Sequence, residues 1–537
     1  MAEQSPQPDE GAKTPPQPDA GLKSLDHYQQ KLPSWRYKLR TMTLPLVRWE
    51  TPFLALFQGY LRTPFLDSWF AITANLGTHT FYMVMLPILF WCGYTEFGRG
   101  MIHLLATGVC FSGFVKDMLC LPRPLSPPLQ RITMSGSAAL EYGFPSTHAT
   151  NAVSVVIYAV YHLSQSDSID PFRRRWILGV LSVYGVSIVI GRLYCGMHGF
   201  FDVVMGSLLG AVLGVVQCKY GDAFDNFLFS GSMKEVAIII LIILTFVRIH
   251  PEPADSCPCF DDSVSFAGVM MGAEFGNWHF AKSTYAWSEP YPATIPFDLQ
   301  SLGWVKTILR LIIGVLVIFV WRGAMKPSLH RALPPLFRVI ERMGLSLPRR
   351  FFTKASQYKQ VPGHLKDDDV FPNMSDIPSM ITNIRHPRRR AISVGPQSEA
   401  DAYEALAYRE KRRRESLSGQ RLSPTLENQP SRDSSPAMQR LRGKASSKSP
   451  SRSPLRLEEY ENMMGEGTPV SDEANEGTSD TSNSPEVDDG RRMFLGITRP
   501  RVRYDVEVVT KLIVYSGIAW WSVEGNPMLF SYLGLAP

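Results

Sequence analysis

One stretch of the sequence contains three short polar clusters: Lys116-Asp-Met-Leu-Cys-Leu-Pro-Arg123-Pro124, Pro145-Ser-Thr-His148 and Arg192-Leu-Tyr-Cys-Gly-Met-His198-Gly-Phe-Phe-Asp202. Apolar segments long enough to cross a bilayer flank them. The clusters contribute cations, two imidazoles, a hydroxyl and a carboxylate, which are the groups that hold a phosphate and move protons. We therefore expect one phosphate site at a face of a membrane protein.

The segments around the clusters predict an all-α fold, a polytopic bundle of transmembrane helices. Predicted spans lie at residues 78–94, 101–115, 147–163, 176–190, 200–216, 236–249, 303–321 and 508–521. Two segments are ambiguous. Residues 52–77 predict a span or an interfacial helix, and residues 263–280, with several glycines and Glu274, predict a weak span or a re-entrant segment. Glycines at 206, 210 and 214 predict close helix packing.

Composition divides the chain of 537 residues into four parts. Residues 1–34 are rich in Pro, Gln and acidic side chains, which predicts a disordered leader without a cleavable signal peptide. Residues 35–325 predict the multi-span membrane core. Residues 349–497, basic and rich in Ser and Pro, predict a long disordered cytosolic insertion, and residues 506–537 predict a terminal membrane segment.

Charge predicts the orientation in the membrane. Short loops rich in Lys and Arg stay in the cytosol, so Arg173, Arg174 and Arg175 place their loop there and the three clusters on the opposite, lumenal side. The basic region from about 322 to 505 is then expected to be cytosolic as well. Its sequon at Asn373 would stay without a glycan.

The remaining composition excludes some classes of function. A net charge of +6 and the absence of a nucleic-acid-binding motif argue against a nucleic-acid partner. Seven cysteines, mostly in or beside apolar segments, do not predict a disulfide framework. Cys257 and Cys259 lie in a polar loop, and the sequence leaves open whether they are paired or free thiols. The oligomeric state also stays open, with a homodimer as one alternative.

Each cluster supplies part of a phosphotransfer site. Fixed positive charge from Lys116, Arg123 and Arg192 would hold the non-bridging oxygens of a phosphate monoester, and arginine matches two oxygens at once. The hydroxyl of Ser146 and backbone N–H groups at the following helix start would add donors.

The histidines complete the predicted chemistry. His198 is the candidate nucleophile, and Asp202, four residues later, would share a helix face with it and orient it. His148 is the candidate general acid for a poor alkoxide leaving group. No carboxylate cluster beside these residues predicts a metal, and no cofactor is expected.

The clusters resemble the three signatures of the type 2 phosphatidic acid phosphatase superfamily. The extended flanks are similar to those of its sphingosine 1-phosphate phosphatase branch, and the basic tail to fungal long-chain-base phosphatases. These flanks are Lys116-Asp117, Pro122-Arg-Pro-Leu-Ser-Pro-Pro128, Glu141-Tyr-Gly-Phe-Pro-Ser-Thr-His-Ala149 and Tyr194-Cys-Gly-Met-His198. The resemblance covers roughly residues 35–321. Gly191 departs from it, because the signature usually has a serine there.

The resemblance implies the superfamily's six-helix core and metal-independent hydrolysis through a phosphohistidine on His198. His148 would act first as acid and then as base for water. The implied substrate is a membrane lipid, a sphingoid base 1-phosphate such as dihydrosphingosine 1-phosphate. The implied location is the endoplasmic reticulum membrane.

Three alternatives remain at this point. One is a related phosphatase of broader specificity, acting on phosphatidate or an isoprenoid diphosphate. Another is a non-enzymatic membrane adaptor, which the retention of all seven polar side chains disfavours. The third is a transporter, which ranks last because the charges cluster at one membrane face instead of along the helix midpoints.

Overall fold

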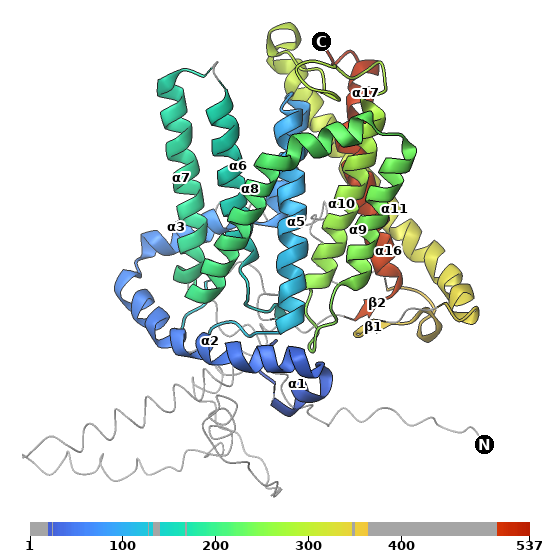
Figure 1. Ribbon diagram of the computed structural model, residues 1–537. Coiled ribbons are helices and arrows are strands. Elements are labelled where there is room, and N and C mark those ends of the chain that lie inside the picture. Colours follow the sequence, from blue (N-terminus) through green and yellow to red (C-terminus); the bar gives the residue numbers. More distant parts are fainter. Residues whose placement is uncertain are drawn as a thin grey trace, which may run out of the picture.

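The computed structural model describes residues 20–23, 25–126, 128–132, 140–166, 169–345, 349–362 and 502–537, and these are almost entirely helical (Figure 1). The helices of the first half are α1 (Leu25–Lys31), α2 (Ser34–Leu61), α3 (Pro64–Asn75), α4 (His79–Trp91), α5 (Thr95–Leu119), α6 (Thr147–Gln165) and α7 (Pro171–Tyr194). Those of the second half are α8 (Phe200–Ser230), α9 (Met233–Ile249), α10 (Cys259–Phe280), α11 (Leu299–Arg342), α16 (Val506–Trp520) and α17 (Asn526–Tyr532). The all-α prediction is confirmed.

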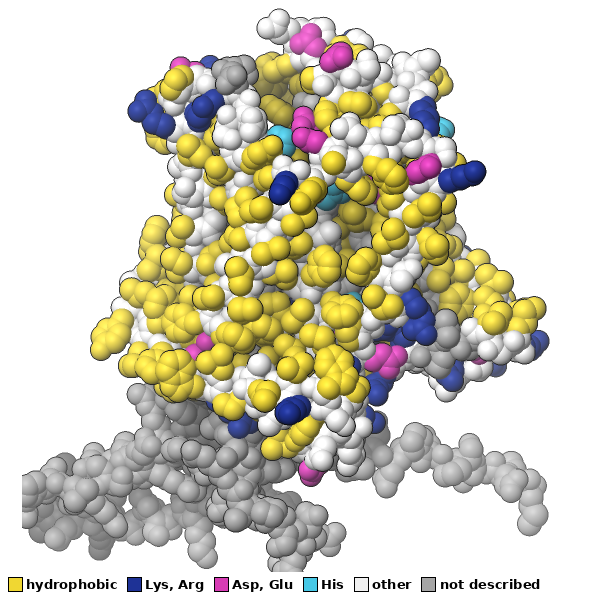
Figure 2. Space-filling model, in the orientation of Figure 1, with side chains coloured by type: hydrophobic (Ala, Val, Ile, Leu, Met, Phe, Trp, Pro, Cys, Tyr) yellow, Lys and Arg dark blue, Asp and Glu magenta, His cyan; other side chains and the backbone are white. Residues whose placement is uncertain are grey.

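Several helices have the length and composition of membrane spans. Within the described residues five stretches qualify, namely α5, α7, α8, α11 and the continuous run Val506–Tyr532 that contains α16 and α17. Hydrophobic side chains cover most of the face of the bundle seen in Figure 2, and on α7 and α8 Val180 and Val204 are more than 60% exposed. A continuous apolar surface of this kind suits lipid and not water. The protein is a multi-pass membrane protein.

Helices α6 and α8 approach one another closely through the predicted glycines. A Cβ atom at Gly206 would lie 2.5 Å from the carbonyl oxygen of Ser146, and one at Gly210 would lie 2.2 Å from that of Thr150. Any side chain there would force the helices apart, since carbon and oxygen cannot approach so closely. The prediction that these glycines serve packing is confirmed, and this packing holds the starts of α6 and α8 together.

The ambiguous segment at 263–280 is the buried helix α10. It packs between α5 and α16, and a Cβ at Gly272 would lie only 2.0 Å from the carbonyl oxygen of Ser516. Its carboxylate Glu274 is fully buried and lies 2.7 Å from Nε2 of His103 on α5. Residues 263–280 are therefore a full-length helix in the bundle and not a re-entrant segment.

The extra helix changes which side of the bundle the chain reaches. From Arg192 the chain passes through α8, α9, α10 and α11, and these four helices bring it back to the end that carries the polar clusters (Figure 1). There Nη1 of Arg349 donates to the carbonyl of His250 at 3.2 Å, and Nε2 of His250 lies 3.0 Å from Asp117.

The prediction that the clusters and residues 322–505 face opposite sides is therefore wrong for the described part of that region. Strand β1 (Phe352–Thr353) pairs in parallel with β2 (Arg503–Tyr504) at the same end. Nη1 of Arg503 donates to the carbonyl of Cys257 at 2.9 Å. Apart from residues 349–362, the region predicted as a disordered insertion lies outside the described residues.

The leader also differs from the prediction. Residues 25–31 form α1, where the hydroxyl of Tyr28 is buried and donates to Asp255 at 2.8 Å. Helix α2 lies across the cluster end of the bundle (Figure 1). Its Arg36 donates to the carbonyl of Met118 at 2.8 Å, which covers the end of α5. The earlier part of the leader, residues 1–19, lies outside the described residues.

The ambiguous residues 52–77 are divided between two helices. Helix α2 ends at Leu61, and Thr63 caps α3 by accepting from the backbone N–H of Leu66. Pro64 occupies the first turn of α3, where its missing N–H costs nothing. The segment is thus the last part of α2, which lies across the cluster end of the bundle, followed by the short helix α3 beside α7.

Candidate active site

The structure brings the predicted site residues to one end of the bundle, although they come from three parts of the sequence. Each lies at or near a helix terminus. Lys116 is in the last turn of α5, Arg123 in the loop after it, Ser146 and His148 at the start of α6, Arg192 in the last turn of α7, His198 in the loop after it, and Asp202 in the first turn of α8.

Arg123 and His198 are in direct contact. Nη1 of Arg123 lies 3.2 Å from Nε2 of His198 and donates to the carbonyl of Met197 at 2.7 Å. On the other side of the ring, Nδ1 of His198 is 2.9 Å from the carbonyl oxygen of Gly143. Because a carbonyl oxygen only accepts, Nδ1 carries the proton of the neutral ring. Nε2 then holds the lone pair and faces the arginine.

Gly143 can supply that carbonyl because it has no side chain. Its N–H donates to the carbonyl of Leu121 at 3.0 Å, and a Cβ there would lie 2.8 Å from the carbonyl oxygen of Pro122. The loop before α6 is thereby held against the loop after α5. Sequence reasoning did not identify this residue, since a backbone acceptor leaves no signal in side-chain chemistry.

Asp202 occupies a different position from the predicted one. Its Oδ2 is 3.6 Å from Nδ1 of His198, beyond hydrogen-bond distance, and accepts from the backbone N–H of Gly199 at 2.9 Å. His198 precedes α8, so the pair does not share a helix face as the four-residue spacing suggested. Asp202 caps α8 and stays within ion-pair distance of the imidazole, while the carbonyl of Gly143 accepts the hydrogen bond from Nδ1.

The other cations and His148 surround this pair. The side chain of Lys116 is 2% exposed. Among the described residues none pairs with the buried guanidinium of Arg192, whose Nε lacks a hydrogen-bond partner. The ring of His148 lies beside Gly77, between α3 and α4. Arg192 is thus a buried cation with donor capacity to spare, as an anion site requires.

Electrostatics keep His198 neutral. Burial first, and then the positive charges of Arg123 and Lys116, lower the pKa of His198 well below its ordinary value. A lowered pKa means that the ring binds its second proton only in more acidic solution, so the lone pair on Nε2 is present at neutral pH. This is the protonation state that a nucleophile needs.

Glu141 is a site residue that the sequence analysis quoted only as part of a motif flank. One of its carboxylate oxygens pairs with Nζ of Lys116, and the other lies 2.7 Å from Nη2 of Arg123. Burial alone raises the pKa of Glu141, but the charges of these two cations outweigh it and hold that pKa well below its usual range. The carboxylate is therefore ionised and occupies part of the cation cluster.

Two further contacts shape the site. Glu50 on α2 accepts from the backbone N–H of Phe201 at 2.9 Å, so α2 helps to fix the start of α8. At Gly191, the departure from the signature, a Cβ would lie 3.0 Å from the ring of Phe70. An aromatic side chain thus fills the space that a serine would otherwise use.

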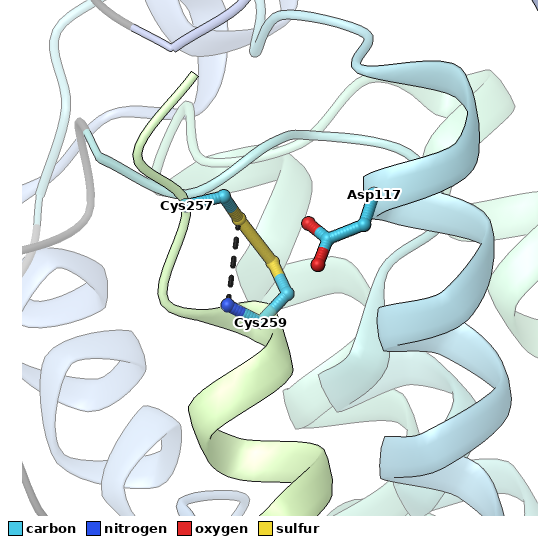
Figure 3. Close-up of side chains that lie close together, drawn as sticks. All are labelled: Asp117, Cys257 and Cys259. Carbon is cyan, nitrogen blue, oxygen red and sulfur yellow. Dashed lines mark hydrogen bonds between the residues drawn. A yellow bond between two sulfur atoms is a disulfide. The ribbon is translucent and has the colours of Figure 1, made fainter. Parts of the chain in front are cut away.

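Cys257 and Cys259 form a disulfide beside Asp117, the neighbour of Lys116 (Figure 3). The carboxylate of Asp117 points toward the two sulfurs, and all three residues are buried. Thiolates and a carboxylate are also metal-ligand types, but sulfurs joined in a disulfide have no thiolate charge to offer. The structure thus selects the paired state from the two that the sequence left open.

Comparison with known proteins agrees with this geometry. Residues 98–223 match the PAP2 superfamily. Dihydrosphingosine 1-phosphate phosphatase C823.11 of Schizosaccharomyces pombe is 42% identical over 306 residues, which cover 57% of this chain and 73% of the relative. Dihydrosphingosine 1-phosphate phosphatase YSR3 of Saccharomyces cerevisiae is 32% identical over 314 residues, 58% of this chain and 76% of the relative. No solved structure matches the chain.

The helical bundle with a cationic site at one end therefore belongs to a membrane phosphatase, and the chain is a member of the PAP2 superfamily. Within the superfamily it is similar to two fungal dihydrosphingosine 1-phosphate phosphatases and, at 26% identity over 300 residues (53% of this chain and 73% of the relative), to human sphingosine-1-phosphate phosphatase 2. Enzymes of this kind hydrolyse lipid phosphates, and the predicted class of enzyme is confirmed.

Proposed function

We propose that this protein hydrolyses sphingoid long-chain base 1-phosphates to the free base and inorganic phosphate without a metal ion. The substrates are dihydrosphingosine 1-phosphate, phytosphingosine 1-phosphate and sphingosine 1-phosphate. The observation that carries the chemistry is the Nε2 lone pair of His198 beside Arg123 in a buried cluster of cations. The fungal and mammalian relatives named for such substrates support the choice of lipid.

The reaction proceeds in two displacements. Nε2 of His198 attacks phosphorus, the bond to the ester oxygen of the lipid breaks, and His148 gives that oxygen a proton. The phosphohistidine then reacts with water, from which His148 removes a proton, so that phosphate leaves and both histidines return to their starting states. Both steps are displacements at phosphorus that need no electron transfer.

The surrounding residues stabilise the charge that builds up during these steps. Lys116, Arg123 and Arg192 hold the non-bridging oxygens, where negative charge is present throughout. The carbonyl of Gly143 stabilises the positive ring of His198 once Nε2 bonds to phosphorus, because Nδ1 keeps its proton. Ser146 caps α6 by accepting from the N–H of Ala149 at 3.4 Å, which leaves its hydroxyl hydrogen to donate toward the phosphate.

The first experiment on this function measures phosphate release from dihydrosphingosine 1-phosphate by detergent-purified protein, with phosphatidate in parallel. We expect the rate in excess EDTA to stay within about twofold of the rate without it, because a histidine nucleophile and fixed cations need no metal-bound hydroxide. We also expect a preference for the sphingoid lipid. Loss of activity in EDTA that zinc or magnesium restores would reject the mechanism, while a preference for phosphatidate would reject the substrate.

We place the protein in the endoplasmic reticulum membrane with its cluster end in the lumen. The Cys257–Cys259 disulfide at that end supports an oxidising compartment. The basic run from Arg173 to Arg175 lies at the opposite end of α7 from Arg192, where the cytosol retains positive charge.

This orientation predicts a glycan on Asn373. The chain leaves the described bundle at residue 362 and returns at 502, both at the cluster end. We expect protein from microsomes to lose mass on treatment with an endoglycosidase, and the Asn373→Gln variant to lack that shift. A second acceptor sequon placed between α10 and α11, at the other end, should stay bare. Modification of the second sequon and not of Asn373 would put the cluster end in the cytosol.

A further inference from the structure

Glu141 occupies the place where a phosphate is expected to bind. Its two carboxylate oxygens pair separately with Lys116 and Arg123, which is how two oxygens of a phosphate would meet the same cations. Its backbone carbonyl also accepts from Nε of Arg123 at 3.0 Å. An incoming phosphate therefore has to take over at least part of these contacts, and the carboxylate then needs a new cationic partner.

The exposure of the side chains shows from which direction that partner comes. The side chain of Glu141 is 28% exposed, whereas those of Lys116 and Arg123 are 2% and 4% exposed. The carboxylate is thus the outer member of the cluster and the cations are the inner members. A phosphate held by the inner cations has its ester oxygen and lipid chain directed outward, past Glu141.

A sphingoid base 1-phosphate carries a suitable cation at this point. Its ammonium group is on the carbon next to the one that bears the phosphate, four bonds from phosphorus and hence at most about 5 Å away. A carboxylate that has just yielded its cations to the phosphate lies within that reach. Glycerol-based lipid phosphates have a neutral ester or hydroxyl at the corresponding carbon, so with them the carboxylate would gain no cation from the substrate.

We infer that Glu141 is a specificity-determining residue, which binds the ammonium group of a sphingoid base 1-phosphate when the phosphate displaces it from Lys116 and Arg123. The inference rests on the proposed function and names how that site recognises its substrate. When a half-buried carboxylate loses its ion pair and gains no other, the free energy of the complex rises. This weakens the binding of lipid phosphates that lack an amine. Selectivity then comes from both the new pair and the penalty on other lipids.

The test compares kcat/KM for dihydrosphingosine 1-phosphate with kcat/KM for octadecyl phosphate and N-acetyl-dihydrosphingosine 1-phosphate, which have no ammonium group. The full-length protein is assayed in detergent as wild type and as Glu141→Gln. We expect the variant to lose at least about tenfold on dihydrosphingosine 1-phosphate, in line with a charge-assisted hydrogen bond. On the other two substrates it should keep its rate or gain, since glutamine competes less for the cations.

Two controls separate the possible outcomes. Glu252→Gln makes the same substitution in the loop between α9 and α10 at the same end of the bundle, and its substrate preference should equal that of the wild type. Activity retained on octadecyl phosphate shows that Glu141→Gln is folded. Equal losses on all three substrates would mean that Glu141 only positions Lys116, and would overturn the inference. Wild-type protein inactive on dihydrosphingosine 1-phosphate would instead overturn the proposed function.

Discussion

Replacing His198 by alanine should lower phosphate release by at least about a thousandfold, with the fold intact. The variant lacks the Nε2 lone pair that lies beside Arg123 and faces the proposed phosphate site. Water would have to attack phosphorus directly in one step, in which His148 cannot serve both as base for the water and as acid for the leaving oxygen. The measurement is phosphate release together with acid-labile labelling of the protein from substrate that carries radioactive phosphate.

The matched control is His162→Ala, which removes a histidine from the far end of α6, where its ring lies against Tyr158. That variant should label and turn over like the wild type. A His148→Ala variant gives a further contrast, since the phosphohistidine it forms should decay more slowly without a base for water. Turnover close to wild type in His198→Ala, or labelling of that variant, would reject the assigned nucleophile.

Replacing Arg123 by lysine should lower kcat/KM by about a hundredfold or more, even though the charge is kept. The guanidinium makes several contacts at once, to the carbonyls of Glu141 and Met197 and to Nε2 of His198. The point charge of a lysine cannot replace this planar set, so both the phosphate and the loop that carries His198 would lose their fixed position. Steady-state kinetics on dihydrosphingosine 1-phosphate measure the effect.

Arg62→Lys provides the comparison for that experiment. Arg62 lies at the same end of the bundle and pairs with Asp67 at 3.3 Å, away from the cation cluster. A partly exposed pair of this kind contributes little, so its rate should stay within about twofold. If Arg123→Lys is no more impaired than Arg62→Lys, Arg123 does not contact the reacting phosphate.

Helix positions were predictable because a bilayer demands long apolar runs, and the glycines of α8 were predictable because close packing demands small residues. Helix α10 was not. Glu274 made its sequence resemble a weak span, and the partner that allows this carboxylate to be buried, His103, is far away in the sequence. The prediction for residues 349–362 was wrong for the same reason. Which end of the bundle they reach depends on whether α10 is included as a full-length helix.

The candidate site residues were predicted from their side-chain chemistry, and the structure gathers them at one end of the bundle. The sequence did not show which of these residues contact one another. The four-residue spacing of His198 and Asp202 suggested a helical pair, but the turn before α8 directs the imidazole to the carbonyl of Gly143. The proposed role of Glu141 depends on a contact with Lys116 that joins the loop before α6 to the last turn of α5.

The pairing of β1 with β2 has a consequence for the evolution of the chain. Phe352 and Arg503 are neighbours, so the segment between them starts and ends at almost the same point in space. The described residues on the two sides of this segment are thus joined by backbone pairing. An insertion or deletion between the two strands therefore leaves the two ends of the segment at the same place, beside the catalytic bundle.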